Sequence, residues 1–402
     1  MSTSQFPTQT SLSSAQPSRL KPTAAQVHQT ITRIEAYLKT IVIHPDRRTG
    51  AFPYYLFHPA GHVIRGTVLL FHGFSAKPHQ MARLASYLFE NGFNVYQPAI
   101  AGHPLLRPEQ NWPQVDLKPA IAQPLKRKIA QDPILGRYFN NLAHNPTFTK
   151  PNRLQQIALV ARLLTLEPRL LDMVTAIENP NDSDFDRYYI SNHMLYLDHA
   201  KERLAELEAM PGPIYAVGLS VGGSVALGIA AAYPHRIRRV VVYAPLLQIY
   251  TQERRRYVNL AGPLDIKETG WEPALQFPVG CMTAVDRFGS SYVMSQPAIE
   301  ALKTVQTFMV LTENEDAADI DTNKEFFINI GGKQRGHFLH LYQPEDLVPH
   351  PMVDPDEVSQ NMSNRYWQSL YQETFRFLST GLIHQSNLMS LEQSTDIPLV
   401  QS

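Results

Sequence analysis

Apolar residues come in short continuous runs that alternate with stretches of helical spacing. Continuous runs cover residues 66–74, 93–100, 213–219, 239–245, 306–312 and 337–343, and shorter strand candidates lie at 40–44 and 52–58. Such runs predict strands buried on both faces, as in a parallel sheet. Helical spacing covers residues 24–40, 78–91, 186–209, 221–233, 320–331 and 364–379. This alternation predicts an α/β fold, a mostly parallel central sheet flanked by helices and joined by right-handed crossovers.

Two stretches interrupt the alternation. Residues 104–185 are rich in Pro, Leu and Asn, with helical pieces at 119–131 and 153–178, and residues 248–303 carry charged and aromatic side chains. Both follow predicted strand C-termini, the edge where open α/β sheets bind ligands. We interpret them as helical cap insertions over a site, because insertions at that edge commonly carry function. Surface decoration is the alternative interpretation.

The chain has room for one large domain with insertions, which we place at residues 23–380. Residues 1–22 are polar and rich in Ser, Thr, Gln and Pro, and are predicted to form a disordered tail. Residues 381–402 are predicted to form a loosely ordered C-terminal tail.

The segment VGLSVGG, residues 217–223, joins the predicted strand 213–219 to the helix 221–233. A G-x-S-x-G turn between a strand and a helix holds the serine, here Ser220, exposed above the sheet as a nucleophile elbow. Gly218 and Gly222 flank it because a side chain at either position would crowd the turn. The pattern alone is common, but the strand–turn–helix context favours a nucleophile over an incidental serine.

A serine hydroxyl needs a base to take its proton and a carboxylate to orient that base. In folds with this elbow the chain order is serine, acid, histidine. The strand 306–312 is followed by the acidic segment TENEDAAD, in which we predict Asp316 as the acid. Asp319 and Glu313 are the competitors, and Asp319 fits the cap of the following helix.

Three histidines lie downstream, at His337, His340 and His350. We predict His350 as the base, because a helix and a final strand fit between Asp316 and the loop LVPHPMV that contains it. The rival interpretation makes KEFFINI the last strand, with His337 in the catalytic loop. His340 would lie inside the strand and is expected to be structural.

The developing oxyanion requires two backbone N–H donors. We predict the N–H of Val221, the residue after the serine, and the N–H of Phe74, in the loop HGFS that follows the strand 67–71. In this arrangement His72 ties the loop by hydrogen bonds and does not act as a base.

These segments resemble the α/β-hydrolase superfamily, and within it the carboxylesterase and monoacylglycerol-lipase-like branch. The resemblance rests on LLFHGFSA, MARLASYLFENGFNVYQPAIAGH, VGLSVGG and the segments of Asp316 and His350, and covers roughly residues 64–103, 190–247 and 304–380. The chain departs from the branch at Gly102-His103-Pro104, where G-H-G is usual, and in lacking a glycine near Glu313. The resemblance implies hydrolysis of carboxylic esters through an acyl-enzyme intermediate, with no metal or organic cofactor.

Composition adds few further signals. Lys plus Arg and Asp plus Glu number 36 each, which does not indicate binding to nucleic acid. Cys281 is the single cysteine, which excludes an internal disulfide and, with the absence of a signal peptide or an apolar run of membrane-spanning length, favours a cytoplasmic protein. The basic runs at 235–239 and 254–256 are expected to be solvated faces.

The expected partner is therefore a small-molecule acyl ester, and a lipid-like ester would bring transient contact with a lipid surface. The sequence carries no signal for an oligomeric state. Two alternatives remain open: an acyltransferase or thioesterase with the same triad, and a non-catalytic binding protein that retains the fold. The second usually shows damage to the triad, and here each position has an occupant.

Overall fold

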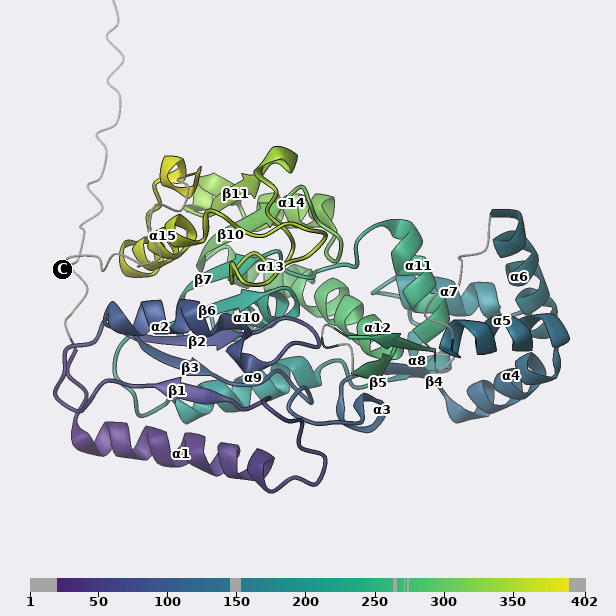
Figure 1. Ribbon diagram of the computed structural model, residues 1–402, viewed down its shortest axis with the longest axis horizontal. Coiled ribbons are helices and arrows are strands. Elements are labelled where there is room, and N and C mark those ends of the chain that lie inside the picture. Colours follow the sequence, from purple (N-terminus) through teal and green to yellow (C-terminus); the bar gives the residue numbers. More distant parts are fainter. Residues whose placement is uncertain (1–19, 145–152, 263–265, 271, 273–274, 390–402) are drawn as a thin grey trace, which may run out of the picture.

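The computed structural model describes residues 20–144, 153–262, 266–270, 272 and 275–389. The centre of this part is a seven-stranded sheet in the order β1–β3–β2–β6–β7–β10–β11 (Figure 1). Its strands are β1 (Tyr54–Leu56), β2 (Thr67–Phe71), β3 (Asn94–Gln97), β6 (Ile214–Leu219), β7 (Ile237–Tyr243), β10 (Gln306–Thr312) and β11 (Phe338–Tyr342). Only β1 is antiparallel to its neighbour within this sheet. The sheet is thus mostly parallel, as predicted.

Helices cover both faces of the sheet. One face carries α1 (Ala24–Val42), α9 (Leu195–Glu206), α10 (Val221–Ala232), α13 (Gln296–Leu302) and α14 (Ile320–Asn329), and the other carries α2 (Ala82–Glu90) and α15 (Trp367–Thr380). Successive residues of β2 alternate between the two cores: Leu69 belongs to the first, and Val68 and Leu70 to the second. Burial on both faces explains why these strands are continuous apolar runs.

The N-terminal region differs from the sequence prediction at one point. The predicted strand 40–44 is wrong, because α1 continues to Val42. Ile34 and Ile41 lie seven residues apart on the buried face of that helix, whereas Ile43 is exposed just beyond its end. Three consecutive β-branched residues therefore close a helix here, because tertiary packing outweighs their strand propensity.

The first insertion lies between β3 and α9. Its elements are α3 (Pro108–Asn111), β4 (Val115–Leu117), α4 (Pro119–Gln131), α5 (Pro133–His144), α6 (Arg153–Leu166), α7 (Leu170–Glu178), α8 (Phe185–Tyr188) and β5 (Tyr189–Ser191). The predicted helix 153–178 is divided at Pro168, which breaks the helical hydrogen bonding. The predicted helix 186–209 begins only at Leu195, because residues 189–191 pair with β4 instead.

The second insertion follows β7. It contains α11 (Gln252–Ala261), a hairpin of β8 (Lys267–Thr269) and β9 (Gln276–Pro278), and α12 (Gly280–Arg287), which continues into a π-helical turn at Phe288–Val293. Both insertions gather at one end of the molecule, where α11 packs against α7 and α12 against β4 (Figure 1).

The remaining connections are short. Three 3-10 helices, η1 (Pro78–Met81), η4 (Gly332–Arg335) and η5 (Pro344–Asp346), precede α2, β11 and the His350 loop, respectively. Of the two predicted tails, residues 1–19 and 390–402 lie outside the described residues, whereas Leu20 bridges Ile64 and η6 (Gln385–Met389) follows α15. The strand order and the β6–turn–α10 connection are those of the predicted α/β-hydrolase fold.

Candidate active site

Ser220 occupies the turn between β6 and α10. Its backbone has φ 57° and ψ −122°, a strained conformation that a non-glycine residue adopts at a nucleophile elbow. A Cβ atom at position 218 would lie 2.1 Å from the carbonyl oxygen of Gly222, and one at position 222 would lie 2.4 Å from that of His72. The turn therefore requires glycine at both flanking positions, as predicted from the sequence.

Backbone hydrogen bonds hold this turn at the C-terminal edge of the sheet. The Ser220 N–H donates to the Tyr243 carbonyl at 2.9 Å, and the Ser220 carbonyl accepts from Ser224 N–H at 3.2 Å and Leu246 N–H at 3.0 Å. Val221 is the first residue of α10, so its N–H lies among the free donors at the positive end of that helix.

His350 and Glu315 form a buried pair. His350 Nδ1 lies 2.5 Å from Glu315 Oε1, and the exposed fractions of the two side chains are 12% and 2%. The same carboxylate oxygen accepts backbone N–H groups of the loop that follows it, from Asp316 at 3.1 Å, Ala317 at 2.9 Å and Ala318 at 3.0 Å. This cradle fixes the carboxylate against the imidazole, and it leaves Nε2 as the ring nitrogen that faces away from Glu315.

The loops that carry the pair continue the parallel pairing of β10 with β11. Thr312 Oγ1 donates to the Val348 carbonyl at 2.5 Å, and Asn314 forms a bridge with Pro349. Glu315 and His350 follow immediately, at the same sheet edge as Ser220. Ser220, Glu315 and His350 therefore lie in this chain order at one edge of the sheet.

The acid that contacts His350 is Glu315 and not the predicted Asp316. The Asp316 side chain is exposed, and its Oδ2 accepts a hydrogen bond from Gln360 Nε2 at 2.7 Å. Neighbouring side chains on an extended loop point in different directions, so a shift of one residue exchanges the buried carboxylate for the exposed one. The two competitors have other contacts, since Glu313 pairs with Lys324 and Asp319 caps α14.

Charge interactions shift the pKa of both members of the pair. Burial would raise the pKa of Glu315, but His350 and the backbone donors lower it below its ordinary value. Burial would lower the pKa of His350, but the adjacent Glu315 carboxylate raises it above its ordinary value, with smaller effects from Asp316 and Glu357. Each partner thus favours the charged form of the other.

The other two histidines do not reach this edge. His337 precedes β11, at the opposite end of the strand, where its Nδ1 accepts from Thr307 N–H at 3.1 Å and its Nε2 lies 3.0 Å from the Ile330 carbonyl. His340 lies buried within β11, as predicted. The segment KEFFINI belongs to α14, which removes the topology that would have favoured His337.

The loop HGFS after β2 contains the predicted donor Phe74. His72 Nε2 accepts from Ile100 N–H at 3.0 Å, so its Nδ1 carries the proton and donates to the Gly73 carbonyl at 2.9 Å. Burial lowers the pKa of His72 to about 3. His72 is a neutral structural residue, as expected, and the Phe74 ring packs edge-on against Trp112 and other aromatic rings.

Arg48, which no sequence pattern singled out, holds the same loop. Arg48 is buried and donates to the carbonyls of Ser75 at 2.7 Å and Ala76 at 3.1 Å, and to Glu272 Oε2 at 2.7 Å. Ser75 has a positive φ of 57°, so this loop needs outside support. No local pattern around Arg48 indicates contacts with residues 27 and 224 positions away.

We expect Arg48→Leu to lower the free energy of unfolding by about 1–3 kcal/mol, because two buried carbonyl oxygens lose their donor. Chemical denaturation measures the change. The matched control is Lys77→Leu, which removes only the ion pair between Lys77 and the half-exposed Glu272 and is expected to cost about 0–1 kcal/mol. Equal effects of the two substitutions would contradict a specific role for Arg48.

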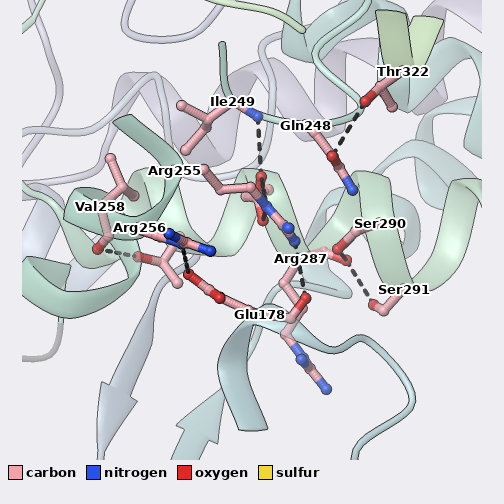
Figure 2. Close-up of polar contacts among 12 residues, drawn as sticks. Glu178, Gln248, Ile249, Arg255, Arg256, Val258, Arg287, Ser290, Ser291 and Thr322 are labelled. Carbon is pink, nitrogen blue, oxygen red and sulfur yellow. Dashed lines mark hydrogen bonds and ion pairs between the residues drawn. The ribbon is translucent and has the colours of Figure 1, made fainter. Parts of the chain in front are cut away.

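A second buried pair connects the insertions with the acid loop. Arg255 Nε donates to both carboxylate oxygens of Asp286, at 3.0 and 2.9 Å, and Arg255 Nη2 donates to the Glu178 carbonyl at 3.2 Å. Asp286 also accepts from Ile249 N–H at 3.0 Å. Figure 2 shows Arg255 between Ile249 and Glu178, residues that belong to different parts of the chain.

The segment around Ile249 in turn lies on the acid loop. Ile249 forms a bridge with Ala318, and Tyr250 N–H donates to the Ala317 carbonyl at 2.9 Å. Ala317 and Ala318 are two of the residues whose N–H groups bind Glu315. Hydrogen bonds therefore run continuously from the Arg255–Asp286 pair to the backbone N–H groups that bind Glu315.

Two further properties concern the described part of the chain as a whole. No three His, Cys, Asp or Glu side chains among the described residues lie close enough together to hold a metal ion. No helix among them combines the length and the apolar composition needed to cross a membrane.

The sequence matches no known protein-family model, and no curated protein matches it significantly. Several solved structures are similar. A structure of the metagenome-derived lipolytic enzymes LipS and LipT has 14% identity and a TM-score of 0.47, covering 82% of this chain and 98% of its own. The monoglyceride lipase of Saccharomyces cerevisiae has 14% identity and a TM-score of 0.47, covering 84% and 94%, respectively. The monoacylglycerol lipase of Paleococcus ferrophilus has 11% identity and a TM-score of 0.46, covering 82% and 99%.

Proposed function

We propose that this chain is a serine hydrolase that cleaves carboxylic esters through an acyl-enzyme intermediate. The observation that carries the proposal is the buried contact between His350 and Glu315 at the sheet edge where Ser220 occupies a strained elbow. Each part has a structural cost, since the elbow is strained and the carboxylate is buried. A catalytic triad accounts for both features at one edge.

In the proposed mechanism Ser220 Oγ attacks the ester carbonyl carbon while His350 Nε2 takes the hydroxyl proton. Glu315 keeps Nδ1 protonated and stabilises the imidazolium that forms. The N–H groups of Val221 and Phe74 bind the oxyanion. Collapse of the tetrahedral intermediate transfers the proton from Nε2 to the leaving alcohol, and water then repeats the sequence on the acyl-enzyme to release the acid.

The substrate class we propose is an acyl ester with a sizeable apolar part. The insertions at the catalytic edge bury many apolar side chains, among them Leu125, Leu163, Leu170, Met173 and Ile177. A cap of this composition favours hydrocarbon over a charged polymer.

The pH dependence of kcat/KM is a direct test of the histidine. His350 must be neutral to accept a proton, and its pKa lies above the ordinary 6.5. We therefore expect kcat/KM to fall as the pH decreases, with a midpoint above pH 6.5, and to be flat on the alkaline side of that midpoint. A pH–rate profile with a neutral ester measures it. A midpoint below pH 6 would contradict the proposed environment of His350.

The function itself is tested by labelling the native protein with a fluorophosphonate, followed by mass mapping of the modified peptide. We expect one adduct, on Ser220, that is absent after heat denaturation. A panel of oxygen esters and thioesters of increasing acyl length then distinguishes esterase from thioesterase activity, and an added alcohol detects acyl transfer. A folded native protein that takes no label would contradict the proposal in favour of a binding protein.

A further inference from the structure

Gln80 connects two segments of the candidate active site. It lies buried in η1, directly after the loop that contains Phe74. Its Oε1 accepts the N–H of Gly73 at 2.7 Å, and its Nε2 donates to Glu357 Oε2 at 3.0 Å. Gly73 belongs to the loop HGFS at residues 72–75, which contains the proposed donor Phe74 and is named the oxyanion loop. Glu357 lies seven residues after His350, in the connection to α15.

The amide can adopt only one orientation here. In the observed orientation the carbonyl oxygen meets an N–H donor and the amino group meets a carboxylate. The reversed orientation would place an amino group against the Gly73 N–H and an oxygen against Glu357, and both contacts would be repulsive. The pair therefore fixes the direction of the Gly73 N–H.

The bridge lies next to the nucleophile. A Cβ atom at position 73 would be 3.0 Å from Gln80 Oε1 and 3.7 Å from Ser220 Cβ, so both side chains lie close to Gly73. On the other side, Glu357 is close enough to His350 to raise its pKa, together with Glu315 and Asp316.

Other charges surround Glu357. Arg83 of α2 binds Asp356 at 2.6 Å and Asp354 at 3.6 Å, and Tyr371 of α15 lies within the field of Glu357. The contacts of Arg83 are partly exposed and are expected to contribute little. The two hydrogen bonds of the buried Gln80 thus connect the segment that follows His350 with the oxyanion loop.

We propose that Gln80 and Glu357 are positioning residues for ester hydrolysis, which hold the oxyanion loop in register with the segment that carries His350. Neither residue touches the reacting atoms. Gln80 sets the course of the loop through Gly73, and Glu357 fixes the orientation of Gln80. The inference rests on the proposed function and adds that kcat depends on a contact outside the triad.

The test exchanges the two groups. Gln80→Glu places two carboxylates against each other, and we expect kcat at pH 8 to fall about tenfold, less than the roughly 100- to 1,000-fold loss of an oxyanion donor itself. KM is expected to change little. The double variant Gln80→Glu/Glu357→Gln restores both hydrogen bonds with the charge moved, and we expect kcat to return to within about threefold of the original protein.

The single variant Glu357→Gln separates the hydrogen bond from the charge. Glu357→Gln can keep the bond by presenting its oxygen to Gln80 Nε2, so we expect a small change in kcat. It removes a negative charge near His350, so the acidic limb of the pH profile is expected to move to lower pH. The shift of the limb therefore reports the charge of Glu357, whereas kcat reports whether the hydrogen bond to Gln80 is kept. Gln296→Leu is the matched control, because Gln296 bonds Glu300 on the exposed face of α13.

The outcomes distinguish the two proposals. If Ser220 in the original protein takes no fluorophosphonate, the proposed function fails and the inference fails with it. If Ser220 is labelled but the double variant is no more active than Gln80→Glu, only the inference is overturned. The same holds if Gln80→Leu, shown to be folded by its melting temperature, keeps full kcat.

Discussion

The Ser220→Ala variant is expected to lose about a million-fold in turnover and all labelling by fluorophosphonate. No other group replaces the attacking oxygen, whereas binding and the oxyanion donors remain. Alanine at position 220 adopts the same backbone conformation as Ser220 and lacks only one oxygen atom. We therefore expect the melting temperature of the variant to lie within a few degrees of that of the original protein. Turnover of a chromogenic ester and a thermal melt measure the two effects.

Ser224→Ala is the matched control for that substitution. Ser224 is also buried on α10, and its Oγ donates to the Leu246 carbonyl at 2.7 Å. We expect this variant to be labelled at Ser220 and to lose some stability, since a buried carbonyl loses its donor. Residual turnover of Ser220→Ala above one per cent of the original would show that another nucleophile carries the reaction.

The second large effect is expected for Glu315→Gln, with a loss of about 1,000- to 10,000-fold in kcat. A neutral amide cannot stabilise the imidazolium, and its amino group can turn toward His350 and force the wrong tautomer. Asp316→Asn should stay within about threefold of the original, because an asparagine oxygen can still accept from Gln360. Steady-state kinetics of the two purified variants measure the difference.

The comparison decides between the two neighbouring carboxylates. A large loss in Asp316→Asn together with an active Glu315→Gln would mean that the acid is Asp316, as the sequence alone predicted. Large losses in both would indicate that the exposed Asp316–Gln360 contact is needed to keep the His350 segment in place. Circular dichroism of each variant separates that effect from unfolding.

The sheet was predictable from the sequence because its strands are buried on both faces and therefore appear as apolar runs. The place of Ser220 in a tight strand-to-helix turn was predictable because that turn requires glycine at fixed positions on either side. The position of His350 beyond the last strand, and of His337 before it, was predictable by counting the elements that must follow Asp316. In each case a requirement of the backbone, of burial or of element order restricts which residues can occupy nearby positions, and that restriction is visible in the sequence.

The contacts of Glu315 and of Arg48 were not predicted from the sequence, for different reasons. The choice between Glu315 and Asp316 depends on where backbone N–H groups of Ala317 and Ala318 point, and loop direction leaves no periodic signal. Arg48 is fixed by carbonyl groups of a distant loop, which any sequence can supply. The strand predicted at 40–44 is wrong because Ile41 is buried on the same face of α1 as Ile34, so the helix continues past the point where strand propensity would end it.

The Arg255–Asp286 pair has a consequence for protein engineering. The Arg255 guanidinium donates to Glu178 at the end of the first insertion and to Asp286 in the second. One buried side chain therefore bonds to both insertions. A chimaera that exchanges only residues 104–185 for a cap from another protein would inherit Arg255 with one acceptor missing. The two insertions are therefore best transplanted as a single unit, although about 60 residues of the main fold separate them in the chain.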